Sequence, residues 1–345
     1  EEEDEENDED DEIIGDKTYS ERIVTSLEKL KKEAHTYLSK DGDLGNYSPK
    51  FLHILENVLD ENNQGLHLLY SQFRTIEGIG IFSMVLEEHG FARFKIRKNS
   101  SGIWNLNMDP EDYIKDADSI PTTRLKPTFA FYTGTESSEE KEIIRNIYNG
   151  NWKYVPPTIA MKLREIAEDN KMGEVIKVLM ITSAGSEGIN LENTRFVHIM
   201  EPYWHPVRTE QVIGRARRIC SHQHLPKELQ TVEVFIYIMI FTEEQLKSDI
   251  AVELRRHDLS KTPPRVPVTT DQYLHELSEI KATVTTQLTD TIKQAAFDCY
   301  IYDNGNCFNF SNPSNSKFSY VPDYSEQKND STLQTNARKI NLQVK

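Results

Sequence analysis

The stretch ITSAGSEGINLENTRFVHIMEPYWHPVRTEQVIGRARRIC, residues 181–220, decides the fold of this chain. It joins a glycine-broken loop, which follows the apolar run VIKVLMI (residues 175–181), to a series of arginines at helical spacing. The apolar run is short and rich in β-branched residues, and it predicts a buried parallel strand. Because parallel sheets bind their ligands at the carboxyl ends of the strands, the loop is expected to lie at a binding edge.

The arginine series predicts a helix with one cationic face. Pro206 suits the first turn of a helix, and Gln211, Arg215 and Arg218 then fall at i, i+4 and i+7 on one face. Gly214 lies beside them without a side chain, so another backbone or a phosphate group could approach closely. Guanidinium groups stabilise the negative charge of a phosphoryl-transfer transition state. We therefore expect Arg215 and Arg218 to be catalytic; the alternative is a solvated basic helix paired with local carboxylates.

Both pieces resemble helicase motifs. QVIGRARR is similar to motif VI, and ITSAGSEGINL to motif V, of superfamily-two helicases. Residues 65–91 and 131–150 resemble motifs IV and IVa of Swi/Snf-type ATPases, and residues 201–206 resemble the segment that precedes motif VI there. The chain is thus similar to the second, C-terminal RecA-like lobe of a Swi/Snf-like helicase, of the kind found in large nucleocytoplasmic DNA viruses.

This resemblance implies an α/β fold, in which helices flank a RecA-like parallel sheet. It implies a nucleic-acid-dependent ATPase, a DNA helicase or translocase of viral transcription or genome handling. The cofactor would be ATP with Mg²⁺, bound mainly by a first RecA-like lobe. That lobe would be one partner, and the others would be nucleic acid, expected to be double-stranded DNA, and transcription machinery.

The resemblance also assigns residues to roles. The ATP-coupling residues would be Gln211, Gly214, Gly188 and Asn190. The nucleic-acid-binding residues, which would hold the phosphate backbone without reading bases, would be Ser71, Gln72, Gly134, Thr135, Thr182, Ser183 and Gly185.

Several positions depart from the remodeller pattern. Gly214, His205 and Cys220 stand where Asp, Asn and Gly are usual, and Ser186 and Glu187 interrupt the usual Gly-Gly-Leu of motif V. These changes argue against nucleosome remodelling. They leave the arginine and glycine scaffold intact, so ATPase coupling is still expected.

Two motifs of a complete ATPase are missing from the sequence. It contains no G-x-x-x-x-G-K-[ST] phosphate loop and no acidic tetrad for magnesium, and it starts at Glu1 rather than at Met. We therefore expect the first lobe to lie upstream or on another polypeptide, and the chain alone to be inactive. Two rival hypotheses are a non-catalytic scaffold or interaction subunit with a helicase-like fold, and a small-molecule enzyme on a similar sheet.

The charge of the chain is unevenly distributed. Its formal net charge is −16, but residues 1–12 carry eleven carboxylates and no base, so removing them leaves −5. Such a block predicts a disordered, solvated tail, with an arm that mimics nucleic acid or binds a basic partner as the alternative. Five arginines are expected to cluster near the motifs, where local charge decides binding: Arg195, Arg208, Arg215, Arg217 and Arg218.

The cysteine count and the hydropathy limit the cellular compartments in which the protein is expected. Three cysteines in 345 residues argue against a disulfide framework, and no apolar run of 18 or more residues or secretory signal occurs. We expect a protein of the host cytoplasm or nucleus, or of the virion, with no membrane contact. Cys220, His222 and His224 lack a fourth ligand at credible spacing, so no metal site is predicted.

Periodicity predicts three regions. Residues 1–45 would be an acidic disordered tail and a linker helix, and residues 46–242 the helicase C-terminal domain, with a polar insertion near 96–126 that lacks clear periodicity. Residues 243–345 would form a helical extension, a brace or partner surface, and a polar tail. The helices expected by spacing cover residues 19–38, 48–62, 137–149 and 158–170.

Overall fold

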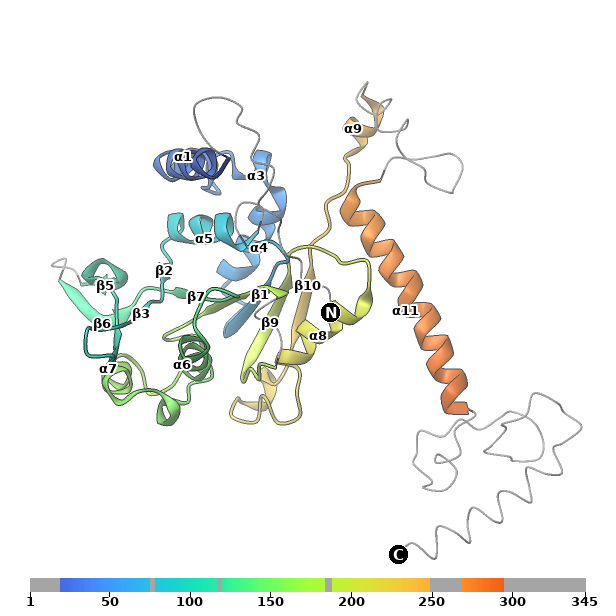
Figure 1. Ribbon diagram of the computed structural model, residues 1–345. Helices are drawn as coiled ribbons and strands as arrows, with labels where there is room; N and C mark the ends of the chain where they lie inside the picture. The colour runs from blue at the N-terminus through green and yellow to red at the C-terminus, as the bar shows by residue number, and fades with distance from the viewer. Residues whose placement is uncertain (1–18, 75–77, 117–119, 184–187, 249–267, 295–345) are drawn as a thin grey trace, which may run out of the picture. The chain divides into compact units, whose positions relative to one another are not determined.

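The computed structural model describes residues 19–74, 78–116, 120–183, 188–248 and 268–294 (Figure 1). The chain divides into two compact units. The first comprises Glu1–Tyr203 and Val207–Tyr273 and holds the sheet. The second comprises Trp204–Pro206 and Leu274–Lys345 and holds most of the long helix α11 (Thr270–Gln294).

Six parallel strands form the sheet of the first unit, in the order β10-β9-β1-β8-β7-β2. The four inner strands, β9, β1, β8 and β7, are almost wholly buried and largely apolar, as expected of strands that are covered on both faces. The predicted α/β fold with a parallel sheet flanked by helices is therefore confirmed. The strands are β1 (Leu66–Tyr70), β2 (Ala92–Arg93), β7 (Thr128–Tyr132), β8 (Val178–Ile181), β9 (Thr194–Ile199) and β10 (Glu233–Ile236).

Two layers of helices cover this sheet, one on each face (Figure 1). Side chains of β1 alternate between them: Leu66 and Leu68 pack with the layer of α6 to α8, and Leu69 packs with the layer of α4 and α5. One layer holds α2 (Ala34–Tyr37), α3 (Leu44–Tyr47), α4 (Pro49–Leu59) and α5 (Ile79–Glu88). The other holds α6 (Ser138–Tyr148), α7 (Pro157–Ile166) and α8 (Pro206–Ala216).

Most of the expected helices occur within a few residues of their predicted ends. The helix expected over residues 19–38 is interrupted, because it consists of α1 (Tyr19–Lys32) and α2, separated by Glu33 with φ −104° and ψ 23°. The helix expected over residues 158–170 ends at Ile166, where Ala167 turns to an extended backbone. Leu38 and Leu44 are buried in the core, so residues after α1 contribute to the packing of the first unit.

The insertion near residues 96–126 is more regular than the sequence predicted. It forms two antiparallel hairpins, one of β3 (Ile96–Lys98) and β4 (Trp104–Leu106), the other of β5 (Tyr113–Lys115) and β6 (Pro121–Leu125). A short 3-10 turn, η1 (Pro110–Asp112), lies between them. In β4 Trp104 and Leu106 are buried on either side of Asn105, while in β3 only Ile96 is buried, so these three-residue strands are too short to give a detectable period of two.

A buried chain of hydrogen bonds crosses the strands β10, β9 and β1. Asn57 Nδ2 donates to the Tyr237 hydroxyl (2.9 Å), which lies 2.8 Å from His198 Nδ1. His198 Nε2 lies 3.0 Å from His67 Nδ1, and His67 Nε2 lies 3.2 Å from the carbonyl oxygen of Asn63. A carbonyl only accepts, so His67 Nε2 donates to Asn63, and with both rings neutral every donor along this chain points from Asn57 to Asn63. Burial keeps both rings neutral, because it lowers the pKa of His67 and lowers that of His198 to about 3.

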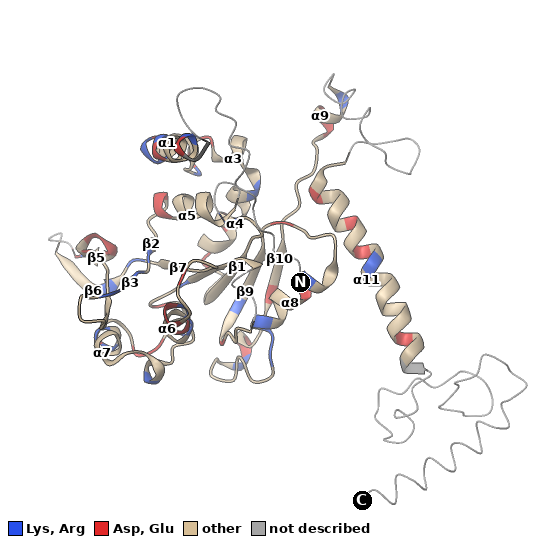
Figure 2. Cartoon of the chain, in the orientation of Figure 1, with Lys and Arg blue, Asp and Glu red and all other residues tan. Residues whose placement is uncertain are grey.

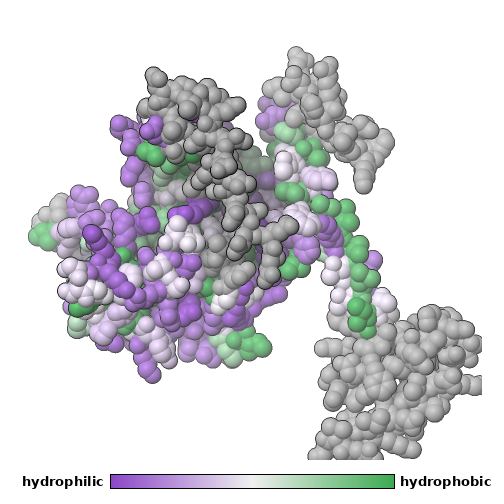
Figure 3. Space-filling view, in the orientation of Figure 1, coloured by the Kyte–Doolittle hydropathy of each residue, from purple (hydrophilic) through white to green (hydrophobic). Residues whose placement is uncertain are grey.

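Two helices lie in the C-terminal region that the structure describes, α9 (Glu243–Lys247) and α11. Residues 249–267 and 295–345, where a helix and a polar tail were expected, lie outside the described residues. Helix α11 exposes a row of large apolar side chains, and Figure 3 shows green along this helix. The exposed aliphatic residues are Ile280, Val284, Leu288 and Ile292, and Tyr273 is exposed near the start of the helix. None of the helices described is both long and apolar enough to cross a bilayer.

Candidate functional site

Four of the parallel strands deliver their following residues to one edge of the sheet. Because β1, β7, β8 and β9 pair in parallel, their carboxyl ends lie at the same edge. The segments that leave this edge begin at Ser71, Thr133, Thr182 and Met200. They contain most of the residues that the motifs predicted.

The segment after β1 is held by a buried carboxylate. Ser71 Oγ donates to Glu201 Oε1 (2.8 Å), and the backbone N–H of Gln72 donates to Glu201 Oε2 (3.1 Å). Burial raises the pKa of Glu201, although these hydrogen bonds and the charge of Lys50 oppose the rise. Ser71 is fully buried, so in this structure its hydroxyl shapes the turn and Gln72 is the residue at the surface.

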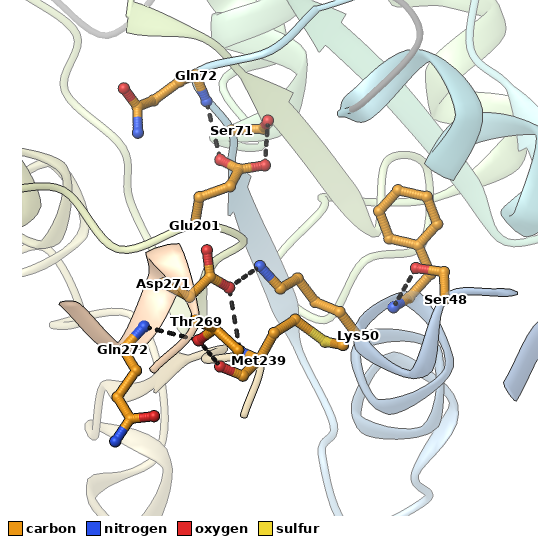
Figure 4. A network of polar contacts seen from close by, with 10 residues as sticks. Ser48, Lys50, Ser71, Gln72, Glu201, Met239, Thr269, Asp271 and Gln272 are labelled. Carbon is orange, nitrogen blue, oxygen red and sulfur yellow. Dashed lines mark hydrogen bonds and ion pairs between the residues drawn. The ribbon is translucent and has the colours of Figure 1, made fainter. Parts of the chain in front are cut away.

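A second carboxylate lies near the first (Figure 4). Lys50 on α4 forms an ion pair with Asp271, which also accepts from the backbone N–H of Met239 (3.0 Å). Thr269 caps the start of α11 by accepting from the Gln272 N–H (3.1 Å). The first turn of α11 is thereby tied to α4 and to the segment after β10.

The segment after β7 is a tight turn closed by Glu136. Its Oε2 accepts from the backbone N–H (2.6 Å) and the hydroxyl (2.8 Å) of Thr133, and its Oε1 accepts from the hydroxyl of Thr135 (3.2 Å). Partial burial alone would raise the pKa of Glu136, but these hydrogen bonds lower it. Gly134 and Thr135 are exposed at the tip, where a ligand can reach them.

The motif V residues lie in different surroundings. Thr182 is buried directly after β8, and Ser183 is partly buried. Gly185, predicted to bind nucleic acid, lies outside the described residues. Gly188 is exposed and has φ +71°, a left-handed conformation that favours glycine. Asn190 is exposed, and its carbonyl oxygen accepts from Asn149 Nδ2 (3.0 Å).

Motif VI packs directly on the end of motif V. The backbone N–H of Leu191 donates to the carbonyl oxygen of Arg215 (3.3 Å), and Arg218 Nη2 donates to the carbonyl oxygen of Ile189 (2.9 Å). The Nε of Arg215 is buried and has no hydrogen-bond partner within the described structure. An unpaired buried donor is costly, by about 1–3 kcal/mol, and an anionic acceptor beside it would relieve that cost.

The prediction that Arg218 lies on the same helix as Arg215 is wrong. Helix α8 ends at Ala216, because Ser221 Oγ donates to the Ala216 carbonyl oxygen (3.0 Å) and accepts from the Arg218 N–H (3.3 Å). Arg218 therefore reaches motif V from the loop that follows the helix. In that loop Cys220 has φ +63°, a left-handed conformation that favours glycine.

The solvent-facing side of α8 leaves space for a ligand near Gly214. Gln211 is exposed, and a Cβ added at Gly214 would have nothing within 4 Å. At the start of the helix Arg208 Nη1 donates to Gln72 Oε1 (3.4 Å), and its guanidinium carbon lies 4.1 Å from the ring centroid of Tyr203. Arg208 thus links α8 to the segment after β1.

Arg195 does not belong to the arginine cluster, contrary to expectation. It lies near the start of β9, at the opposite edge of the sheet, and it is 7% exposed. Its guanidinium donates to the Gln64 carbonyl oxygen and lies 3.5 Å from Thr231 Oγ1. Its role is therefore to hold two loops at that edge.

Other residues that sequence reasoning singled out or missed serve the local structure. His222 Nε2 lies 2.7 Å from the carbonyl oxygen of Thr194, and its Nδ1 lies 2.8 Å from Ser221 Oγ, so both ring nitrogens are engaged. Across the described ranges no three His, Cys, Asp or Glu side chains gather as they would around a metal ion. Asn149, which clamps motif V through Asn190 and the Glu192 N–H (3.0 Å), gave no signal in the sequence.

The same chain is similar to known helicases. Residues 126–220 match the helicase conserved C-terminal domain. The chain is 29% identical over 298 residues to the termination factor NPH-I homolog of African swine fever virus (isolate Warthog/Namibia/Wart80/1980), which covers 84% of this chain and 38% of that relative. A putative ATP-dependent RNA helicase of Acanthamoeba polyphaga mimivirus is 27% identical over 290 residues, or 83% and 39% of the two chains.

The chain therefore spans about two fifths of the length of these relatives. A crystal structure of the C-terminal part of the Fun30 ATPase domain aligns with 68% of this chain and 52% of its own, at 16% identity and a TM-score of 0.31. The predicted likeness to helicases of large DNA viruses is confirmed, and the match to the helicase conserved C-terminal domain covers residues 126–220.

Proposed function

We propose that this chain is the second RecA-like lobe of a nucleic-acid-dependent ATPase, a Swi/Snf-like DNA helicase or translocase that acts in viral transcription or genome handling. One observation carries the proposal: two arginines of motif VI meet the end of motif V, Arg215 through its backbone and Arg218 through its guanidinium. Any movement of the phosphate-facing arginines is therefore transmitted to the segment that leaves β8.

The chemistry expected of this lobe is electrostatic. When ATP is bound on a first lobe, closure would bring Arg215 and Arg218 to the γ-phosphate, where guanidiniums stabilise the charge that develops during transfer. Gly214, with open space around it, leaves room for a phosphate group, and Gln211 on the exposed side of α8 would couple the lobes. In this proposal Mg²⁺ accompanies ATP and is held mainly by the first lobe.

The nucleic acid would lie along the carboxyl edge of the sheet. Gly134 and Thr135 are exposed at that edge, and Gln72 and Ser183, which follow β1 and β8 there, are partly exposed. Backbone amides, hydroxyls and side-chain amides hold phosphates without reading bases, which suits a protein that moves along a duplex. Double-stranded DNA is the proposed substrate; the mimivirus relative is named as an RNA helicase, which makes RNA the competing substrate.

The first prediction tests the role of Arg218 in an enzyme in which this chain is joined to a phosphate-loop lobe. Arg218→Lys keeps the charge but loses the planar, multidentate group. Because an arginine finger is worth about 10³–10⁵ in rate in GTPases, we expect kcat of DNA-stimulated ATP hydrolysis to fall at least about tenfold while ATP binding is kept. Steady-state phosphate release and nucleotide titration measure the two quantities.

Arg217→Lys is the matched control, since Arg217 is an exposed neighbour in the same loop. It should leave kcat within about twofold of wild type, as expected for a surface residue outside the transition state. If Arg218→Lys turns over as fast as Arg217→Lys, Arg218 has no finger role. If the joined wild-type enzyme hydrolyses no ATP at all, the chain is better explained as a non-catalytic scaffold with a helicase-like fold.

A further inference from the structure

The first hairpin of the insertion carries an unusual charge pattern for this acidic chain. Residues 92–107 contain four cations and no carboxylate, while the whole chain has a net charge of −16. Figure 2 shows these Lys and Arg positions around β2 and β3. The four residues, here called the cationic ridge, are Arg93, Lys95, Arg97 and Lys98, and all four are exposed.

The ridge stands on a fixed support. Alternating with its cations, Phe94 and Ile96 are 3% and 8% exposed, and Trp104 and Leu106 of β4 are 9% and 8% exposed. All four pack in the same core cluster as Ile159 of α7. The hairpin is therefore held to the domain by its apolar face, and Arg93, Lys95 and Arg97, which alternate with Phe94 and Ile96, lie on the other face.

Two of the four cations, Arg93 and Lys98, contact other side chains of the domain, and these contacts show where the ridge lies. The Arg93 guanidinium carbon lies 4.6 Å from the ring centroid of Phe131 on β7. Lys98 Nζ pairs with Glu139 (2.6 Å), which also accepts from Trp104 Nε1 (2.7 Å). Glu139 is in the first turn of α6, directly after the turn that follows β7. The ridge is therefore next to the carboxyl-edge segment that the proposed function places on nucleic acid.

The other two cations have no such partner. Within the described residues neither Lys95 nor Arg97 forms an ion pair. Arg97 lies opposite Asn105 in the hairpin register, and Asn107 follows on the same strand side, its N–H bonded to the Lys95 carbonyl oxygen (2.9 Å). Asn99 joins Arg97, Lys98 and these amides around a hollow of about 340 Å³.

We infer that the cationic ridge is a second nucleic-acid contact, outside the helicase motifs, which holds the phosphate backbone through Lys95 and Arg97. Cations supply the attraction to phosphate, and the amides of Asn105 and Asn107 supply hydrogen bonds to phosphate and sugar oxygens. The inference rests on the proposed nucleic-acid binding and adds a separate surface to it. The ridge lies next to the turn that carries Gly134 and Thr135, so a duplex bound at this edge of the sheet would contact both the ridge and that turn.

The test is a fluorescence-anisotropy titration of the full 345-residue chain with a DNA duplex, repeated across a salt series. The duplex has about 20 bp, which is enough to span several phosphate contacts. The variant is Lys95→Gln with Arg97→Gln. Because it removes two cations from the phosphate backbone, the slope of log K against log salt should become shallower by about 1.8, at about 0.9 for each phosphate. The same chain is titrated with a duplex of shuffled sequence and with an RNA duplex.

The matched control is Lys31→Gln with Lys32→Gln, which removes the same charge from exposed positions on α1. Circular dichroism and the urea midpoint check that both variants are folded. A ridge variant that binds with the slope and affinity of the control overturns the inference but leaves the proposed function standing. If the wild-type chain binds none of the DNA or RNA duplexes, both the inference and the proposed nucleic-acid binding are overturned.

One further outcome would replace nucleic acid by a segment of this chain. If the ridge variant binds DNA more tightly than wild type, and the difference vanishes when residues 1–12 are deleted from both, the ridge holds the acidic N-terminal segment. That result overturns the inference. Equal effects of the ridge variant with and without residues 1–12 support it.

Discussion

At the scale of single residues, Cys220 adopts a backbone conformation that carries a physical cost. Its φ of +63° lies in the left-handed region, which costs a side-chain-bearing residue roughly 1–2 kcal/mol. The residue is exposed, so no buried packing compensates. The strain sits two residues after Arg218, in the loop that Ser221 closes through hydrogen bonds.

Replacement of Cys220 should therefore affect stability in opposite directions. Cys220→Gly removes the strain, offset by roughly 0.5–1 kcal/mol of extra chain entropy, and should leave the free energy of unfolding unchanged or raised by up to about 1 kcal/mol. Cys220→Val, β-branched in a left-handed position, should lower it by about 1–2 kcal/mol. Urea unfolding of both variants and wild type measures this. A Val variant as stable as the Gly variant would contradict the strained backbone.

At the scale of elements, the paired histidines of β1 and β9 make the stability of the sheet depend on pH. Burial is the main cause that lowers the pKa of His67, with His198, Lys177 and Arg195 adding to it, and burial alone lowers the pKa of His198 to about 3. The unfolded chain binds these protons near pH 6.5, while the folded chain does not. The stabilisation is therefore complete above about pH 6.5 and is lost as the pH falls below it.

We predict that the free energy of unfolding falls by about 1.4 kcal/mol per pH unit for each of the two histidines as the pH drops from about 6.5. His198→Phe should remove the contribution of one histidine to this pH dependence of the free energy of unfolding, about 1.4 kcal/mol per pH unit. It should also cost about 1–3 kcal/mol at neutral pH, because His67 Nδ1 and the Tyr237 hydroxyl lose their partner. Urea unfolding of wild type and of His198→Phe at several pH values measures this pH dependence. A His198→Phe slope equal to that of wild type would show that the ring is not neutral and buried.

The elements that the sequence predicted well are those with local signals. The apolar runs of β1 and β8 and the spacing of α4 and α6 are each complete within a dozen residues. The hairpins of the insertion were missed, because few side chains mark their buried face: Ile96, Trp104, Leu106 and Leu125. The site was predicted residue by residue only where motifs exist. The hold of Glu201 on Ser71 could not be foreseen, since 130 positions separate the two residues.

The end of α8 shows the same limit at close range. Helical spacing alone placed Arg218 on the face of Arg215, yet a hydroxyl five residues after Ala216 ends the helix. Helix periodicity cannot register such a side-chain contact to the backbone, because it depends on the path of the following loop. The two arginines still meet motif V, but through different parts of their structure.

At the scale of the whole molecule, charge is divided between an acidic beginning and local basic surfaces. Eleven carboxylates lie in residues 1–12, and the remainder of the chain has a net charge of −5. The binding surfaces proposed here, motif VI and the cationic ridge, are positive despite that balance. Local potential, and not net charge, governs encounter with a polyanion, and salt screens it with a length of about 10 Å at 0.1 M.

The chain spans about two fifths of its relatives and contains neither a phosphate loop nor an acidic magnesium motif. The most direct measurement of its role is ATP hydrolysis by the chain alone and by the chain joined to a phosphate-loop lobe, each with and without duplex DNA. We predict no DNA-stimulated hydrolysis by the chain alone, and DNA-stimulated hydrolysis by the joined lobes that depends on Arg218. Hydrolysis by the isolated chain, or joined lobes that stay inactive with DNA, would contradict the account.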